Sequence, residues 1–318
     1  MASNPFAIYP SLRGRAVVVT GGATGIGASM VEHFARQGSR VAFFDVQDDE
    51  AAALVDSVGR GAESAPVFFH CDLTDVDALR AVTEEALAAL GSADVLVNNA
   101  ANDQRHRIED VTEEYFDASI AVNLRPQFFM MQAVLPAMKA AGRGSIINMS
   151  SIAWVIPSTG VPVYVAAKAA IVGLTRTMAH ELGPAGIRVN AVLPGAIATE
   201  KQKRLVYTPE YKAEILANQA LKREILPEDV ARLVLFLAAD DSSAIWHELQ
   251  KMRRSKSGEL PDPDFYVTRA IGHDELLPWD FIDHHIHKWF LLSERMKAHY
   301  EHQTKPCDVT RCTVCGAC

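Results

Sequence analysis

The stretch AVVVTGGATGIGASMVEHFARQ, residues 16–37, decides the fold. It begins with a short run rich in β-branched apolar residues, continues through glycines and ends in a segment with helical character. This order predicts a strand, a tight turn and a helix whose N-terminus can bind a pyrophosphate. The alternative is that these glycines form an ordinary turn that binds no ligand. The predicted contacts with a dinucleotide come from Gly21, Gly25, Ile26 and Gly27.

Alternating strands and helices continue along the chain. Strands are predicted at 40–44, 67–70, 94–97, 145–149 and 188–193, and helices at 76–90, 113–123, 127–140, 164–182 and 227–241. Such alternation implies a parallel sheet with ligands at the carboxyl ends of its strands. The predicted fold class is therefore α/β, with a doubly wound, Rossmann-like parallel sheet.

Asp45 ends the second predicted strand, about twenty residues beyond the glycines, where a carboxylate can accept hydrogen bonds from an adenosine ribose. The same charge would repel a 2′-phosphate, so NAD is predicted rather than NADP. The alternative is an ordinary acidic residue at a turn.

Charge and composition point to a small-molecule partner. The 318 residues carry a formal net charge of -8 and have a sequence pI of about 5.8, which disfavours nucleic acid and anionic membranes as partners. The first thirteen residues have no signal pattern, and no apolar run is long enough to cross a membrane. A cytoplasmic location is predicted.

Tyr164 and Lys168 lie four residues apart in a predicted helix, and Ser151 precedes the tyrosine by thirteen residues. Residues four apart share a helix face, so a lysine charge could lower the pKa of the phenol and make it a better base. The alternative is a chance spacing on an amphipathic helix.

The motifs described so far, with Asn98-Asn99-Ala100 and Pro194-Gly195, occur in the order typical of classical short-chain dehydrogenases/reductases, which residues 1–245 resemble. The resemblance implies that Tyr164 is the acid/base, that Ser151 polarises the reacting oxygen, and that Lys168 holds the ribose and lowers the pKa of Tyr164. Asn123 would support a proton-relay water. Further cofactor contacts are expected from Asp72, Leu73, Asn99, Tyr164, Lys168, Pro194, Gly195, Ile197 and Thr199. The resemblance also implies a homodimer or a higher homo-oligomer.

Within that family the chain resembles bacterial NAD-dependent aldose 1-dehydrogenases of the D-xylose type, through residues 7–12, 102–106, 123–125 and 201–210. Such an enzyme oxidises C1 of a pentose-like sugar to a lactone. Asn102 and Gln202 could bind sugar hydroxyls, and Trp154 could offer an apolar face to the ring. A turn asparagine, a surface glutamine and a tryptophan at the edge of the core are the alternatives.

The family pattern ends near residue 245, where the expected final strand is missing from the sequence. Residues 246–318 form a predicted second segment, mainly helical or irregular, that resembles the C-terminal tail of cobalamin-binding-type radical SAM proteins. Four cysteines near its end could hold Zn²⁺ or an iron–sulfur cluster. Disulfides or a reduced, metal-free tail are the alternatives. The predicted ligands are Cys307, Cys312, Cys315 and Cys318.

The predicted function is hydride transfer from an aldose to NAD. Two alternatives stay open: a short-chain reductase acting on another alcohol or ketone, and a cofactor-binding or metal-binding protein whose catalysis is weakened by the altered C-terminus.

Overall fold

A single parallel sheet organises the described part of the chain. The computed structural model describes residues 7–156 and 158–240, all within the compact unit Met1–Glu248. Six strands pair in the order β3-β2-β1-β4-β5-β6, every pair parallel. The strands are β1 (Ala16–Thr20), β2 (Arg40–Asp45), β3 (Val67–His70), β4 (Val95–Asn98), β5 (Gly144–Met149) and β6 (Ile187–Val192). The strand order reverses between β1 and β4, so the predicted doubly wound, Rossmann-like fold is confirmed.

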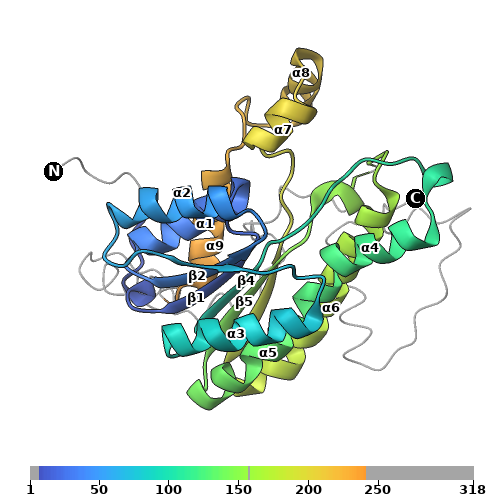
Figure 1. The fold of residues 1–318 in the computed structure, drawn as a ribbon. Helices are drawn as coiled ribbons and strands as arrows, with labels where there is room; N and C mark the ends of the chain where they lie inside the picture. Colours follow the sequence, from blue (N-terminus) through green and yellow to red (C-terminus); the bar gives the residue numbers. More distant parts are fainter. Residues whose placement is uncertain (1–6, 157, 241–318) are drawn as a thin grey trace, which may run out of the picture. The chain divides into compact units, whose positions relative to one another are not determined.

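Helices cover both faces of this sheet (Figure 1). One hydrophobic core lies between the sheet and α1 (Gly25–Arg36), α2 (Asp48–Gly59) and α9 (Pro227–Ala238). The other lies beneath α3 (Val76–Leu90), α5 (Arg125–Ala141) and α6 (Pro162–Leu182), and α4 (Glu113–Asn123) packs against α5 and α6. All five residues of β1 are buried, as expected for a central strand with helices on both sides.

Two short helices stand away from the sheet (Figure 1). They are α7 (Glu200–Leu205) and α8 (Pro209–Asn218), and every residue in them keeps some exposure. Ile197 pairs with Ile225 in an isolated parallel bridge, and the Ala198 N–H donates to the Ile225 carbonyl at 2.9 Å. We call residues 199–224, which this bridge closes at the base, the excursion.

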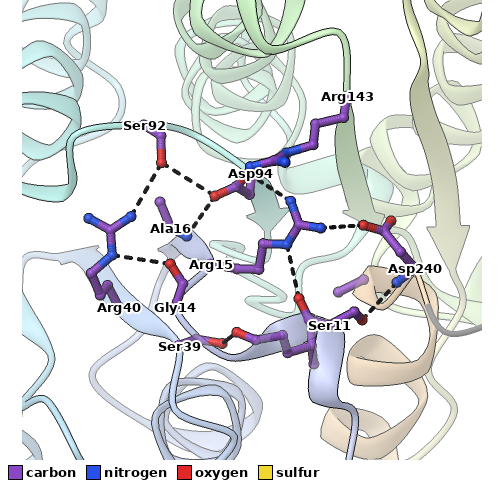
Figure 2. Close-up of polar contacts among 12 residues, drawn as sticks. Ser11, Gly14, Arg15, Ala16, Ser39, Arg40, Ser92, Asp94, Arg143 and Asp240 are labelled. Atoms are coloured by element: carbon purple, nitrogen blue, oxygen red, sulfur yellow. Dashed lines mark hydrogen bonds and ion pairs between the residues drawn. The ribbon is translucent and has the colours of Figure 1, made fainter.

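A charged network joins the amino ends of the central strands (Figure 2). The buried carboxylate of Asp94 accepts hydrogen bonds from the Ala16 backbone at 2.9 Å, from Arg15 at 3.1 Å and from Arg143 at 3.0 Å. Arg15 also pairs with Asp240 at 2.5 Å. Burial raises the pKa of Asp94, but these hydrogen bonds outweigh it and hold the pKa below its ordinary value. The network ties the chain together at the end of the sheet opposite to the predicted ligand site.

The predicted elements occur with small shifts at their ends, whereas α2, α7 and α8 were not among them. The missing final strand, the tail over residues 246–318 and its four cysteines lie outside the described residues. Within the described ranges, no helix has the length and apolar character needed to cross a membrane.

Candidate active site

The carboxyl ends of four neighbouring strands bring the predicted site together. The glycine turn follows β1, Asn99 follows β4, Ser151 follows β5 and Pro194 follows β6. This edge contains the point where strand order reverses, which is where open parallel α/β sheets bind ligands.

The glycine turn is held too closely for side chains. A Cβ at Gly27 would lie 1.8 Å from the Gly21 carbonyl oxygen, and Gly21 itself has a φ of +64°. The Asn99 amide donates to the carbonyls of Thr20 at 3.1 Å and Gly21 at 2.9 Å. Asn99 therefore fixes the shape of the turn, and its side chain is committed to the protein backbone.

The first turn of α1 suits a bound phosphate group. Within the described residues, the Thr24 side chain does not cap α1, and its hydroxyl lies 3.3 Å from the Gln47 amide that donates to it. The first turn contains no acidic residue. Backbone N–H donors and the positive end of the helix dipole are thus available, and Gly25 and Ile26 lie in this turn. The residues present fit a dinucleotide pyrophosphate.

Asp45 ends β2 beside this turn, with 8% of its surface exposed. One carboxylate oxygen accepts from the Ala23 N–H at 2.9 Å, and the other accepts from the Val46 N–H at 2.8 Å. Asp45 therefore supports the glycine turn in addition to placing a negative charge next to it. This structural role was not apparent from its position in the sequence.

The remaining residues predicted to contact the cofactor differ in exposure. Asp72 is exposed and accepts from the Thr74 backbone and hydroxyl, which lower its pKa. Leu73 and Ile197 have their side chains in the two hydrophobic cores, so only their backbones could meet a cofactor. Beyond β6, the Pro194 carbonyl accepts from the Ile152 N–H at 3.0 Å, Gly195 is exposed, and Thr199 caps α7 through Gln202.

Ser151, Tyr164 and Lys168 come together as predicted from their spacing. The Lys168 Nζ lies 5.5 Å from the centroid of the Tyr164 ring and donates to the Met149 carbonyl at 2.8 Å. Ser151 accepts from the Ala153 N–H at 3.1 Å, and its side chain is near enough to the Tyr164 hydroxyl to lower the pKa of the phenol. A phenol, a hydroxyl and an amine thus share one space at the end of β5.

The pKa of Tyr164 differs from the expectation that Lys168 lowers it. This pKa is raised to about 12, mainly by burial. The interaction with Ser151 opposes the increase, and the charge of Asp103 adds to it. Burial also lowers the pKa of Lys168 from 10.5 to about 7, although Asp103 opposes that change. A lysine that is only partly charged near neutrality stabilises a phenolate weakly, so desolvation of both groups reverses the expected direction.

Asn123 lies at the junction of α4 and α5, fully buried. Its amide accepts from the Asn102 N–H at 2.9 Å and donates to the Asn102 carbonyl at 3.0 Å. The side chain therefore fixes the loop that follows β4, and through it the backbone of one predicted substrate residue.

The predicted substrate residues come from three separate segments. The Asn102 side chain accepts from the Gln104 N–H at 3.1 Å, and Trp154 ends η3 (Ile152–Trp154) with 36% of its surface exposed. Gln202, on α7, donates to Asp103 at 2.7 Å. Asp103 was not among the predicted site residues, yet its charge acts on both Tyr164 and Lys168. The sequence signals were a carboxylate in the loop after β4 and its place within residues 102–106, one of the segments that resemble aldose dehydrogenases.

Comparison with known proteins adds to this geometry. Residues 21–248 match a family model described as enoyl-(acyl carrier protein) reductase. The chain belongs to the short-chain dehydrogenase/reductase family. It is therefore an oxidoreductase of the dehydrogenase type that acts on a CH–OH group, and members of this family use a nicotinamide dinucleotide.

This short-chain dehydrogenase matches several known proteins over most of their length. A probable galactose dehydrogenase from Rhizobium meliloti is 51% identical, over 76% of this chain and 94% of the relative. A D-xylose 1-dehydrogenase from Caulobacter vibrioides is 50% identical, over 74% and 93%. A solved short-chain type dehydrogenase/reductase from Mycobacterium ulcerans has a TM-score of 0.70 at 25% identity, over 74% and 86%.

The match to the family model ends at residue 248 and does not extend over the C-terminal segment 249–318. The matches give no support to the radical SAM resemblance of residues 246–318 or to a zinc or iron–sulfur site. Among residues 7–156 and 158–240, no group of three or more His, Cys, Asp or Glu side chains could hold a metal ion. The predicted ligands Cys307, Cys312, Cys315 and Cys318 lie outside those ranges.

Proposed function

We propose that this chain oxidises an aldose at C1, transfers hydride to NAD and releases a lactone. The observation that carries the proposal is the convergence of Ser151, Tyr164 and Lys168 beside a glycine turn suited to a pyrophosphate. Half-identical relatives named for galactose and D-xylose favour a sugar as the substrate.

Three side chains would handle the proton. Ser151 would donate a hydrogen bond to the reacting oxygen, and the Tyr164 phenolate would take the hydroxyl proton as the C1–H bond breaks with its electron pair. The C1 oxygen then becomes the carbonyl oxygen of the lactone. Lys168, in its charged form, would stabilise the phenolate. The bound nicotinamide supplies the hydride acceptor.

The high pKa of Tyr164 bears on the direction of reaction. A phenol with a pKa of about 12 is a proton donor at neutral pH, which suits reduction of a carbonyl. Oxidation uses the phenolate, whose fraction rises with pH, but the charge of Lys168 that would stabilise it is lost above about pH 7. We therefore expect the rate of oxidation to change little between pH 7 and 9.

NAD rather than NADP is proposed because the Asp45 carboxylate lies beside the glycine turn. The domain boundary near residue 245, the cytoplasmic location and the homo-oligomeric state stay predictions.

A substrate panel tests the proposal. D-xylose, D-galactose, other aldoses and simple ketones would be assayed with NAD(H) and NADP(H) at pH 7 and 9. We expect aldose oxidation with NAD and a loss of several powers of ten in Tyr164→Phe, with cofactor affinity little changed. Ketone reduction without aldose turnover would replace the sugar by another CH–OH substrate.

Retained activity in Tyr164→Phe would refute the catalytic assignment. A wild-type chain that binds NAD but turns over no member of the panel would favour the cofactor-binding alternative over an enzyme. Cofactor affinity, measured separately by the quenching of protein fluorescence, distinguishes these outcomes from simple misfolding.

A further inference from the structure

Asp103 links the excursion to the catalytic residues. Its two carboxylate oxygens contact α7, Oδ1 at 2.8 Å from the Lys201 Nζ and Oδ2 at 2.7 Å from the Gln202 Nε2. On the other side, the charge of Asp103 acts on Tyr164 and Lys168. Asp103 therefore contacts the excursion directly and is near enough to the catalytic pair for its charge to act on both members.

The loop that carries Asp103 is fixed rather than loose. The preceding residue, Asn102, is held at both its N–H and its carbonyl by the buried amide of Asn123. This places the Asp103 backbone at a set position relative to α4. Asn123 thus fixes the backbone next to Asp103, and α7 holds the Asp103 side chain.

The carboxylate is ionised and keeps unused hydrogen-bonding capacity. Burial raises the pKa of Asp103, but the hydrogen bond and charge of Lys201, together with hydrogen bonds from the Asp103 backbone N–H and from Gln202, outweigh it and leave the pKa below its ordinary value. A carboxylate has about four acceptor positions, and Lys201 and Gln202 use one on each oxygen. With 36% of the side chain exposed, the carboxylate can accept further hydrogen bonds from hydroxyl groups.

Lys201 and Gln202 complete a set of donors and acceptors. A sugar hydroxyl both donates and accepts, so it can donate to Asp103 while it accepts from the Lys201 ammonium or the Gln202 amide. A neighbouring hydroxyl on the same ring can use the second carboxylate oxygen. Hydrogen bonds that involve ionised groups are about twice as strong as neutral ones.

We propose that Asp103, with Lys201 and Gln202 beside it, is the specificity-determining acceptor for the hydroxyl on the carbon next to the reacting carbon of a polyhydroxylated substrate. This deepens the proposed function and rests on it for the reacting carbon. The residue selects substrates by their hydroxyls, whereas Tyr164 and Ser151 act on the reacting oxygen.

The role predicts discrimination between alcohols. A substrate that lacks the vicinal hydroxyl leaves charged, partly buried groups without their partner. Sites built to bind a hydroxyl can reject the analogue without it by up to about 10⁴ to 10⁵. Because Asp103 is partly exposed and already paired, we expect a smaller preference for diols over monohydric alcohols, on the order of 10² in kcat/KM.

The test compares the full-length wild type with Asp103→Asn, which keeps the shape of the side chain and removes its charge. Asp110→Asn, an exposed aspartate in the same loop region, is the matched control. Two substrate pairs are used: an aldose and its 2-deoxy analogue, and cyclohexane-1,2-diol and cyclohexanol. Binding of a 1,5-anhydro sugar, which lacks the reacting hydroxyl, is measured by calorimetry with NAD present.

We expect Asp103→Asn to lower kcat/KM for the hydroxyl-bearing member of each pair by about 30-fold to 100-fold and to change the other member less than threefold. The 1,5-anhydro sugar should bind at least tenfold more weakly. Asp110→Asn should match the wild type. An equal loss for both members would assign Asp103 a structural or electrostatic role and overturn the proposal, as would unchanged binding of the anhydro sugar.

The second pair and the calorimetry separate this inference from the proposed function. If the wild type prefers the diol but oxidises no aldose, the proposal that the substrate is a sugar fails and the role of Asp103 stands. If it oxidises aldoses and their 2-deoxy analogues equally well, the role of Asp103 fails and the proposal that the substrate is a sugar stands. If the wild type turns over nothing and does not bind the anhydro sugar, both fail.

Discussion

Replacing Lys168 by Met should stabilise the fold while it removes activity. Lys168 is buried to 1% exposure, and burial lowers its pKa from 10.5 to about 7. Each unit of pKa corresponds to about 1.36 kcal/mol, so burying the charged amine costs about 5 kcal/mol at pH 6. Met fills similar space without a charge but loses the hydrogen bond to Met149, which is worth about 1 kcal/mol.

The sign of the stability difference between Lys168→Met and the wild type depends on pH. Between the folded and unfolded pKa values the unfolded chain binds more protons, so wild-type stability rises with pH from about 7 to 10.5. Below that window the full cost is present, and above it the cost is gone. We therefore expect Lys168→Met to be about 4 kcal/mol more stable at pH 6 and about 1 kcal/mol less stable near pH 10.5.

Thermal unfolding of the full chain, followed by circular dichroism without added cofactor, measures this difference. An increase of about 4 kcal/mol corresponds to roughly 10 °C in Tm for a domain of this size. Lys139→Met, an exposed lysine on α5, should shift Tm little at either pH. A Lys168→Met protein that is no more stable than the wild type at pH 6, or whose advantage is the same at both pH values, would show that the lysine charge carries no burial cost.

Two further substitutions probe the cofactor site and the opposite end of the sheet. Asp45→Ala should reduce the preference for NAD over NADP about tenfold or more. It should also weaken the binding of both cofactors, because the Ala23 N–H loses its acceptor. Fluorescence titration measures both affinities, and a wild-type preference for NADP would contradict the argument. Asp94→Asn should lower the free energy of unfolding by about 3 kcal/mol at pH 7, because Arg15 and the Ala16 N–H lose a buried charged acceptor. The pKa of Asp94 is lowered by folding, so this loss should shrink as acid protonates the wild-type carboxylate. Urea unfolding at pH 7 and at a pH well below 3.8, the ordinary pKa of an aspartate, checks this expectation. The half-exposed Arg143→Gln is a control that should cost less than about 1 kcal/mol, and an equal loss in both variants would rule out a special role for Asp94.

The sequence predicted elements best where local signals define their ends. Helix α3 begins as predicted because the Asp75 side chain accepts from the backbone at its start, and α4 begins as predicted because Thr112 does the same. Helix α2 buries only Ala51 and Val58, which leaves a weak apolar pattern. The residues of α7 and α8 stay at least partly exposed, so periodicity gave no indication of them.

The sequence predicted which residues meet in the site better than it predicted their pKa values. The spacing of Tyr164 and Lys168 placed them on one face, but their pKa values depend on how much water the fold removes around them. The contacts of Asp103 join residues about a hundred positions apart. No local pattern encodes such a pairing, because it arises only when the loop after β4 meets α7.

The bridge between Ile197 and Ile225 separates two kinds of evolutionary constraint. Substitutions between these residues alter a surface next to the proposed substrate site without disturbing the packed layers, since the excursion adds little to either core. Insertions, deletions or a transplanted segment from a relative could enter there at small thermodynamic cost. The scaffold can thus acquire a new substrate range by exchange of the excursion alone, provided that the replacement again supplies hydrogen-bond partners for Asp103.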